Sequence, residues 1–354
     1  MIGPVVAIVL SYLRSYELIP LCKSEWEYRS ITQRFIKEFG LVDPVGSLFD
    51  ADIPYLKGIR ILNLTGCGKI TNRGLKHLKG IHTINLSGCK KITDPGLEYL
   101  KGVHTIYLSC CDKITDHGLQ YLEGIHTIDL SFCDKITSKG LEYLKGVQDI
   151  NLEGCGLITD TGLEYLKRVH KINLGGCKHI TNKGIEYLKG IKKISLKYCY
   201  LITDSGLKYL EGIHSVNLTD CDLITDEGLQ YLKGAHTINL TRCRNVTDRG
   251  LEYLKGIQEI FLESCNQITD RGLQYLQGVH SIHLTWSQNI TDRGLEYLKG
   301  AHTIDLSYCH LITDAGLEYL KGVHTIYLVY CKNITKSGLK CLEGAEKIIW
   351  FPPL

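Results

Sequence analysis

The sequence predicts an α/β solenoid, in which a curved parallel β-sheet is backed by short helical turns on its convex side. Three observations support this fold. A unit of 22 residues recurs thirteen times over residues 59–338. Each unit contains a segment of alternating apolar and polar residues, which is typical of a strand with one buried face. Each unit also contains apolar residues three positions apart, which is typical of one or two helical turns.

The strand occupies the first part of each unit. Residues 81–102 represent the unit and read IHTINLSGCKKITDPGLEYLKG. Ile84 and Leu86 lie two positions apart, so both point into the core, whereas Asn85 and Ser87 point to the opposite face. One unit cannot bury its own apolar edge, but stacked units form a continuous core.

The second part of the unit predicts a short helix. Thr93 is a good N-cap residue, and Asp94 lies where the helix dipole favours a negative charge. Leu97 and Leu100 share one face of the turn. The segment is too short for a long helix, so we expect one or two turns, partly 3₁₀, that end at Gly102.

Three columns are nearly invariant among the copies. The Thr93 position is Thr and the Gly96 position is Gly in all thirteen units. A third position is Cys in twelve units, and we expect it to be buried, with its S–H near a carbonyl of the turn. Its members are Cys67, Cys89, Cys111, Cys133, Cys155, Cys177, Cys199, Cys221, Cys243, Cys265, Cys309 and Cys331.

This pattern, L-x-x-L-x-L-x-x-C-x-x-[IV]-T-D-x-G-L, resembles the cysteine-containing class of leucine-rich repeats. The resemblance covers about five-sixths of the chain. Residues 41–58 are expected to be a linker and a degenerate first repeat, and residues 339–354 a C-terminal cap in which Trp350 stands at a strand leucine position. Solenoids need such caps to close the ends of the core.

The first forty residues lack the repeat and resemble an F-box, the small helical domain that often precedes this repeat class. The resemblance rests on Leu10-Ser11-Tyr12-Leu13, Glu17-Leu18, Leu21-Cys22 and Trp26 within residues 4–37. It implies an F-box-like helical domain over residues 1–40. The residues implied to bind an adaptor are Val6, Leu10, Leu13, Leu18, Leu21 and Trp26.

The family resemblance implies a function. F-box proteins bind a Skp-type adaptor, a cullin scaffold joins that adaptor to a RING ligase, and the repeats hold the substrate. The chain is thus expected to be the non-catalytic substrate-recognition subunit of an SCF-type ubiquitin ligase, binding an unknown target protein on the concave face. One alternative is a leucine-rich-repeat scaffold without a ligase role. Another is an enzyme that uses the solenoid to hold its substrate.

The outward-facing strand positions vary far more than the core columns, and large aromatic residues gather there in the C-terminal units. Aromatic residues on an exposed strand face are typical anchors of protein interfaces. We therefore predict a substrate-binding patch, with drift of exposed positions as the alternative. Its members are Phe261, His283, Trp286, Tyr308, Tyr327 and Tyr330, and the same columns also contain Arg242 and Glu263.

A second candidate surface is basic and comprises Lys171, Lys193 and Lys197. Such a cluster suits an acidic or phosphorylated peptide. Asp149 and Glu153 lie one unit earlier, so a solvated face of mixed charge is the favoured alternative.

Several functions are not expected. Lys and Arg total 41 against 38 Asp and Glu, which argues against nucleic-acid binding. The sequence has no phosphate loop, GxSxG, HExxH or CxxC motif, so neither a cofactor nor catalysis is predicted. One histidine per unit is not ligand spacing, so no metal site is predicted. The histidine column comprises His82, His104, His126, His170, His214, His236, His280, His302 and His324.

Compartment is inferred from two features. Cysteine recurs once per unit as a core position, and four Asn-x-Ser/Thr sequons, at Asn63, Asn85, Asn217 and Asn239, fall inside predicted strands. Free thiols persist in a reducing compartment, and in a secreted protein glycans at these sequons would cover the sheet. Both features therefore favour a reducing compartment. No apolar run approaches the length of a membrane helix. We expect a cytoplasmic monomer, with the nucleus, or a host cytoplasm if the source is a virus or bacterium, as further compartments.

Overall fold

The computed structural model describes residues 48–351. These residues form two units, the first ending at His179 and the second starting at Ile180. Each unit is a stack of repeats with one strand per repeat. The F-box-like segment and its six predicted adaptor contacts lie outside the described residues.

In the first unit, six short strands alternate with helical turns. The strands are β1 (Ile61–Asn63), β2 (Thr83–Asn85), β3 (Thr105–Tyr107), β4 (Thr127–Asp129), β5 (Asp149–Asn151) and β6 (Lys171–Asn173). The α-helices are α4 (Asn72–Leu75), α5 (Asp94–Leu97), α6 (Asp116–Leu119) and α7 (Asp160–Leu163). The 3₁₀ turns are η1 (Ile53–Leu56), η2 (Lys76–Leu78), η3 (Glu98–Leu100), η4 (Gln120–Leu122), η5 (Gly140–Leu144) and η6 (Glu164–Leu166).

The second unit repeats this order with eight strands. They are β7 (Lys193–Ser195), β8 (Ser215–Asn217), β9 (Thr237–Asn239), β10 (Glu259–Phe261), β11 (Ser281–His283), β12 (Thr303–Asp305), β13 (Thr325–Val329) and β14 (Lys347–Phe351). The α-helices are α8 (Asn182–Glu186), α9 (Asp204–Leu207), α10 (Asp226–Leu229), α11 (Asp248–Leu251), α12 (Asp270–Leu273), α13 (Asp292–Leu295) and α14 (Asp314–Leu317). The 3₁₀ turns are η7 (Lys208–Leu210), η8 (Gln230–Leu232), η9 (Glu252–Leu254), η10 (Gln274–Leu276), η11 (Glu296–Leu298), η12 (Glu318–Leu320) and η13 (Gly338–Leu342).

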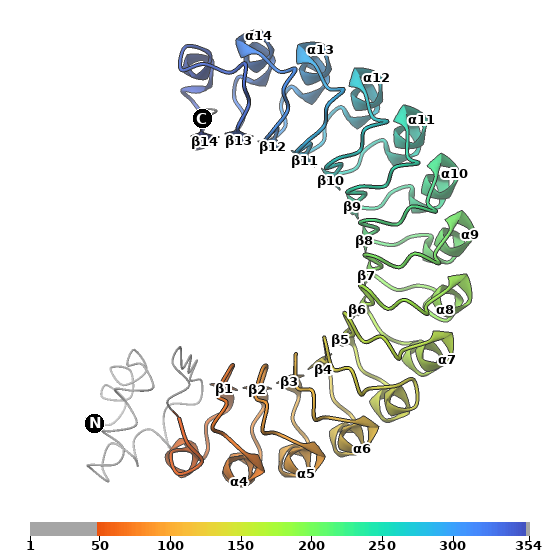
Figure 1. Cartoon of the computed structure of the whole chain (residues 1–354). Coiled ribbons are helices and arrows are strands. Elements are labelled where there is room, and N and C mark those ends of the chain that lie inside the picture. The colour runs from red at the N-terminus through yellow and green to blue at the C-terminus, as the bar shows by residue number, and fades with distance from the viewer. Residues whose placement is uncertain (1–47, 352–354) are drawn as a thin grey trace, which may run out of the picture. The chain divides into compact units, whose positions relative to one another are not determined.

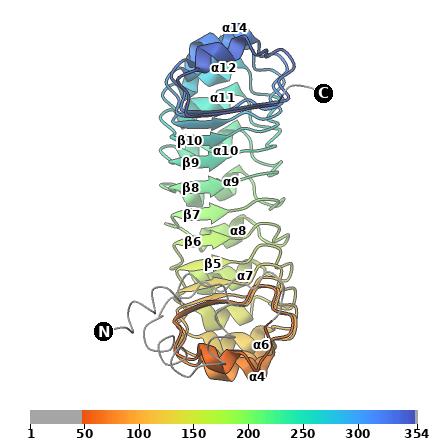
Figure 2. The same ribbon diagram turned by 90° about the vertical axis from the view of Figure 1, so that its left-hand side faces the viewer.

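The strands of each unit pair in parallel, and the register equals the repeat period. Ile84 lies opposite Ile106 in the first unit, and Ile260 lies opposite Ile282 in the second. Within each unit the strands line the inner side of an arc and the helices line the outer side (Figure 1). The strands are stacked side by side, so equivalent residues form continuous columns (Figure 2). The predicted solenoid architecture is confirmed.

The core lies between the strands and the helical turns. Ile84, Leu86, Ile92 and Leu97 are fully buried, and Leu100 is almost so. Burying each such side chain contributes about 1.5–3 kcal/mol before the entropic cost of ordering it. The columns predicted to be apolar therefore build the core, and the outward strand positions are left to face solvent.

The helical segment has the predicted mixed character. One four-residue α-helical turn is followed by a three-residue 3₁₀ turn in most repeats, and the chain leaves the turn through a glycine such as Gly102, at φ +79°. Thr115 caps α6 because its hydroxyl accepts the N–H of His117 at 3.2 Å. Asp94 has a role that the sequence did not indicate: its carboxylate accepts hydrogen bonds from Thr115 of the next repeat.

The cysteine column is buried, and its thiols donate to backbone carbonyls. The Sγ atoms of Cys89 and Cys111 lie 3.1 and 3.2 Å from the carbonyl oxygens of Leu64 and Leu86, each in the preceding repeat. The predicted contact of the thiol with a carbonyl is confirmed. Ser287 takes the place of Cys in one repeat, and its hydroxyl lies 3.4 Å from the Leu262 carbonyl oxygen.

The last described strand, β14, ends the ladder of the second unit. Trp350 lies opposite Leu328, and Phe351 lies opposite Val329. The side chains of β14 are only partly buried or exposed, in contrast with the fully buried Leu328. The ladder therefore ends on a strand with larger, partly exposed side chains.

Candidate functional site

The turn after each strand is fixed by a polar residue that ends the strand. In β9, the Asn239 Oδ1 atom accepts the backbone N–H of Thr241 at 2.8 Å. The same bond joins Asn217 to Thr219 at 2.9 Å and Asp305 to Ser307 at 2.8 Å. The sequon asparagines are therefore structural residues of the strand end, because they hold the turn that presents the next two side chains.

The second residue of this turn has a left-handed backbone in every repeat. In the second unit all seven occupants carry side chains, with φ between +55° and +63°: Tyr198, Asp220, Arg242, Ser264, Trp286, Tyr308 and Tyr330. We name these seven residues the left-handed column. In the first unit the position is glycine at Gly66, Gly88, Gly154 and Gly176, and it is occupied by Cys110 and Phe132 in the other two described repeats. A side chain there costs on the order of 1 kcal/mol relative to glycine.

Three of the predicted patch residues belong to the left-handed column and contact one another. The Trp286 ring stacks on the Tyr308 ring at a centroid distance of 4.3 Å and an interplanar angle of 10°. Tyr330 continues the row at 5.2 Å from Tyr308. His310 meets Trp286 edge-on at 6.2 Å. Trp286 is 46% exposed, so a large aromatic surface faces solvent.

The other three predicted patch residues lie on the strands. Phe261 in β10 stacks on His283 in β11, with ring centroids 4.2 Å apart. Tyr327 in β13 is separated from His283 by Asp305, which lies opposite both in the ladder. The Lys347 Nζ atom lies 5.7 Å from the Tyr327 ring centroid. The six predicted residues thus form a row of three, a pair and a separate tyrosine.

Glu263 is a half-buried carboxylate beside this patch. Partial burial, followed by the nearby Asp305 carboxylate, raises its pKa, whereas His283 and Arg242 act in the opposite direction. A hydrogen-bond donor that approaches the Glu263 carboxylate would stabilise its charged form.

A groove of about 480 Å³ lies along the left-handed column from Lys197 to Trp286. Two buried polar atoms of its lining, Asp220 Oδ2 and Thr241 Oγ1, have no hydrogen-bond partner among the described residues. Thr241 is only 8% exposed. Sequence reasoning missed this groove. The available signal was the replacement of glycine by larger residues in one column of otherwise similar copies.

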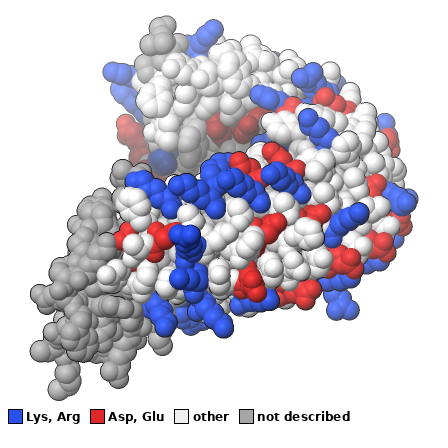
Figure 3. Space-filling view, turned by 60° about the horizontal axis from the view of Figure 1, so that its bottom comes forward, with Lys and Arg blue, Asp and Glu red and all other residues white. Residues whose placement is uncertain are grey.

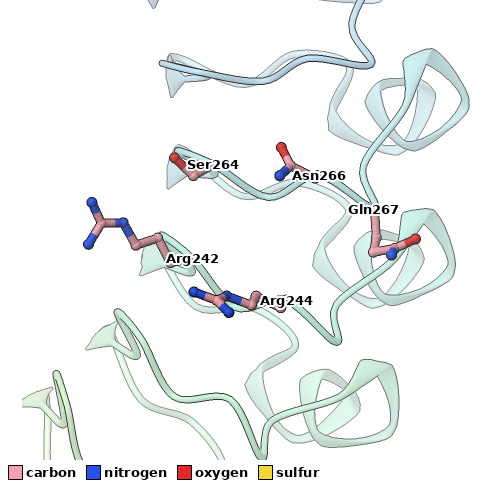
Figure 4. A pocket seen from close by; sticks show the side chains of 5 residues that line it. All are labelled: Arg242, Arg244, Ser264, Asn266 and Gln267. Carbon is pink, nitrogen blue, oxygen red and sulfur yellow. The ribbon is translucent and has the colours of Figure 1, made fainter.

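A second cavity, of about 380 Å³, adjoins the groove and shares Arg242 and Ser264 with it. Arg244, Asn266 and Gln267 complete its lining (Figure 4). Two guanidinium groups and no carboxylate line this cavity, so it suits an anion.

The predicted basic patch is divided between the two units. Lys171 belongs to the first unit, where its Nζ atom lies 3.0 Å from Asp149 Oδ2. Lys193 in the second unit is exposed, and the Lys197 Nζ atom lies 4.9 Å from the Tyr198 ring centroid at one end of the groove. Figure 3 shows Lys and Arg interspersed with Asp and Glu over the visible face, in keeping with the balanced composition.

The histidine column forms stacks of rings. His104 stacks between His82 and His126 at 4.6 and 4.5 Å, and His302 stacks between His280 and His324 at 4.6 and 4.1 Å. No group of three His, Cys, Asp or Glu side chains within residues 48–351 is arranged to hold a metal ion. No helix in this part of the chain is long and apolar enough to cross a membrane.

Comparison with known proteins agrees with this architecture. A family model described as Leucine Rich repeat matches residues 59–79, 81–101, 125–145, 213–233 and 302–321. No curated protein matches the sequence.

Among solved structures, a chain of the TLR13–ssRNA13 complex has 15% sequence identity and a TM-score of 0.62. The match covers 83% of this chain and 47% of that chain, so the present chain spans about half its length. A chain of the Rad7 and Elc1 complex in yeast is 14% identical with a TM-score of 0.52, covering 95% of this chain and 89% of that chain. A leucine-rich-repeat protein of Leptospira interrogans is 16% identical with a TM-score of 0.54, covering 91% and 86%.

These identities are low, so the likeness to the solved structures is one of fold alone. The family matches, the parallel ladder with a 22-residue register and the buried apolar columns agree with one another. The chain is a leucine-rich-repeat protein.

Proposed function

We propose that this chain is the substrate-recognition subunit of an SCF-type ubiquitin ligase. The observation that carries the proposal is the presence, in one chain, of the F-box-like segment at residues 4–37 and a repeat surface with exposed, stacked aromatic residues. The segment binds a Skp-type adaptor and, through it, a cullin scaffold. Trp286 and its neighbours bind the target protein.

The stacked residues Trp286, Tyr308 and Tyr330, here called the aromatic row, support a role in protein binding. Hot spots of interfaces are rich in Trp and Tyr, because these side chains bury a large area at a low cost in conformational entropy. Trp286 and Tyr308 are held rigid by their mutual stacking. The complex of Rad7 and Elc1, which contains a chain of this fold and similar length, also joins two proteins.

In this proposal the chain binds and does not catalyse, and the ubiquitin transfer belongs to other subunits. We place it in the cytoplasm, because its repeated cysteines are buried thiols and its sequons fall within the sheet. In the absence of partners we expect a monomer.

The test is co-purification of the full chain with a Skp-type adaptor. The same experiment is repeated with residues 1–40 deleted and with the double variant Leu10→Asp, Leu13→Asp. We expect the wild type to retain the adaptor and both altered chains to lose it. The proposal fails if the wild type does not bind the adaptor.

The alternative function is a leucine-rich-repeat scaffold with no ligase role. It is favoured by the fact that the aromatic row and the groove lie entirely within residues 197–330 and need no contribution from the first forty residues. A chain that fails to bind the adaptor but still captures a target protein through Trp286 supports this alternative.

A further inference from the structure

The left-handed column of the second unit carries non-glycine residues in a backbone conformation that favours glycine. Gly66, Gly88, Gly154 and Gly176 show that glycine is compatible with this position in the same repeat. The second unit nevertheless carries a side chain at all seven positions. Backbone strain of this kind persists where the side chain has a use that outweighs it. Among the described repeats of the first unit, only Cys110 and Phe132 carry a side chain at this position, so the second unit is distinguished by an unbroken run of seven.

The basic part of this surface is built for an anion. Arg242 and Arg244 lie on the same turn, and Ser264 and the amide of Asn266 come from the next repeat (Figure 4). Arg242 has a weak ion pair with Asp220, at 3.7 Å. No hydrogen bond or ion pair involves the Arg244 side chain within the described residues. The Arg244 guanidinium is thus free to bind a ligand, whereas the Arg242 guanidinium is weakly paired with Asp220.

The groove next to this cavity has unmet hydrogen-bonding capacity. Thr241 Oγ1 and Asp220 Oδ2 are buried and form no hydrogen bond among the described residues, and Asp220 Oδ2 has only the ion pair with Arg242 at 3.7 Å. A buried polar group without a partner is costly, so a ligand that supplies one gains affinity. The backbone N–H groups of an extended peptide are donors of the kind that Asp220 Oδ2 lacks.

Trp286 lines the far end of the same groove, and its ring stacks on Tyr308 beyond the groove. Arg242 and Trp286 are two repeats apart, which corresponds to roughly 10 Å along the ladder. An extended peptide spans this distance with about three residues. A ligand that fills both places therefore carries an anion and an apolar side chain about three residues apart.

We propose that the left-handed column binds an extended phosphorylated peptide. The phosphate lies between Arg242 and Arg244, and an apolar or aromatic side chain lies against Trp286 and Tyr308. Phosphate is favoured over carboxylate because it has three acceptor oxygens and about two negative charges, which match two guanidinium groups with neighbouring hydroxyl and amide donors. The inference deepens the proposed function, on which it rests only for the role of the peptide as the ligase target.

The test uses the full chain and two degenerate peptide pools. One pool has phosphothreonine at its central position and the other has threonine there. We expect the phosphorylated pool to be retained about tenfold or more above the other, with apolar or aromatic residues enriched about three positions from the phosphate. Equal retention of the two pools, or enrichment of no residue at that spacing, overturns the proposal.

Variants assign the contacts, using fluorescence anisotropy with the best peptide from the phosphorylated pool. Arg244→Ala should weaken binding by about tenfold or more and leave unfolding in urea nearly unchanged, because this exposed side chain has no hydrogen bond or ion pair among the described residues to lose. Trp286→Gly should weaken binding similarly while keeping or raising the urea midpoint, since glycine suits a left-handed backbone.

Cys110→Gly is the matched control. Cys110 is exposed and occupies the equivalent position in the first unit, at φ +57°, so the backbone change is equivalent but lies outside the groove. It should leave peptide affinity unchanged. If Trp286→Gly binds the peptide like wild type, the aromatic contact is wrong. Loss of peptide binding with adaptor co-purification intact would overturn this inference alone, because the adaptor assay depends on residues 1–40.

Discussion

Asp248 at the start of α11 is bound to Thr269 at the start of the next helical turn. The backbone N–H of Thr269 donates to Asp248 Oδ1 at 2.7 Å, and its hydroxyl donates to Oδ2 at 2.6 Å. The same Thr269 hydroxyl accepts the N–H of Arg271 at 3.3 Å. One carboxylate therefore fixes the helix cap of the following repeat, and the bond recurs through most of both units.

Asp248→Ala should destabilise the protein by about 1–3 kcal/mol, because it leaves the N–H and hydroxyl of Thr269 without their acceptor. Asp248→Asn is the matched control. Asn72 occupies the equivalent position and bonds Thr93 through both its amide oxygen and its amide nitrogen, so Asn should cost less than Ala. Urea unfolding followed by circular dichroism measures both. An equal loss for Ala and Asn would contradict a role for this hydrogen-bond pair.

In most repeats the invariant glycine of the helical turn is explained by the equivalent carboxylate of the preceding repeat. A Cβ atom at Gly118 would lie 2.6 Å from Asp94 Oδ1 and 3.0 Å from Leu97 Cδ1. Gly118→Ala should therefore cost about 1–3 kcal/mol, through displacement of the carboxylate and the leucine. Gly156→Ala is the control, because no atom lies within 4 Å of its Cβ position and its φ is not left-handed. A urea midpoint lowered by Gly156→Ala as much as by Gly118→Ala would contradict the steric explanation.

The fold could be predicted from the sequence because each apolar position of the repeat is explained by residues close to it along the chain. Alternation placed Ile84 in the core, and spacing placed Leu97 on the buried face of the turn. The Asp94 bond to Thr115 was not predicted, since it joins residues 21 positions apart and is visible only once the register is known.

The candidate site was predicted only in part, and for a similar reason. The aromatic residues could be named as candidates because Trp and Tyr stand out in copies that are otherwise alike. The groove was not found, because it depends on a left-handed φ at Arg242 and on the burial of Thr241, which neither residue type indicates. A column occupied by glycine in some copies and by large residues in others is the pattern that would have revealed it.

The reactivity of each thiol should depend on whether it belongs to the buried cysteine column. Burial raises the pKa of the Cys89 thiol to about 12, and its Sγ atom lies 3.1 Å from the Leu64 carbonyl oxygen. Cys110, in contrast, is exposed. Brief maleimide treatment of the native chain should modify Cys110 at least about a hundredfold faster than Cys89, because only a thiolate in contact with solvent reacts readily. Peptide-resolved mass spectrometry measures both sites. Comparable labelling of the two would show that the core column opens on the timescale of the reaction.

The histidine stacks should make the protein sensitive to acid. Desolvation, followed by repulsion from His126 and His82, lowers the pKa of His104, and desolvation with repulsion from His324 and His280 does the same for His302. Since the unfolded chain has the higher pKa, it binds more protons than the folded chain at mildly acidic pH. The stabilising contribution is therefore complete above the ordinary histidine pKa of about 6.5 and falls as the pH drops through the lowered values.

His104→Gln tests this effect at one stack. Glutamine already occupies the column at Gln148 and Gln258, so the change is compatible with the repeat. The urea midpoints of variant and wild type should coincide at roughly pH 7.5 and separate below about pH 6, with the wild type falling more steeply because only it gathers like charges in the stack. In the variant, the substituted glutamine cannot take up a proton, so its neighbours His82 and His126 are not repelled by a charge at that position. If the urea midpoints of both proteins nevertheless fell in parallel, the acid sensitivity would have another origin.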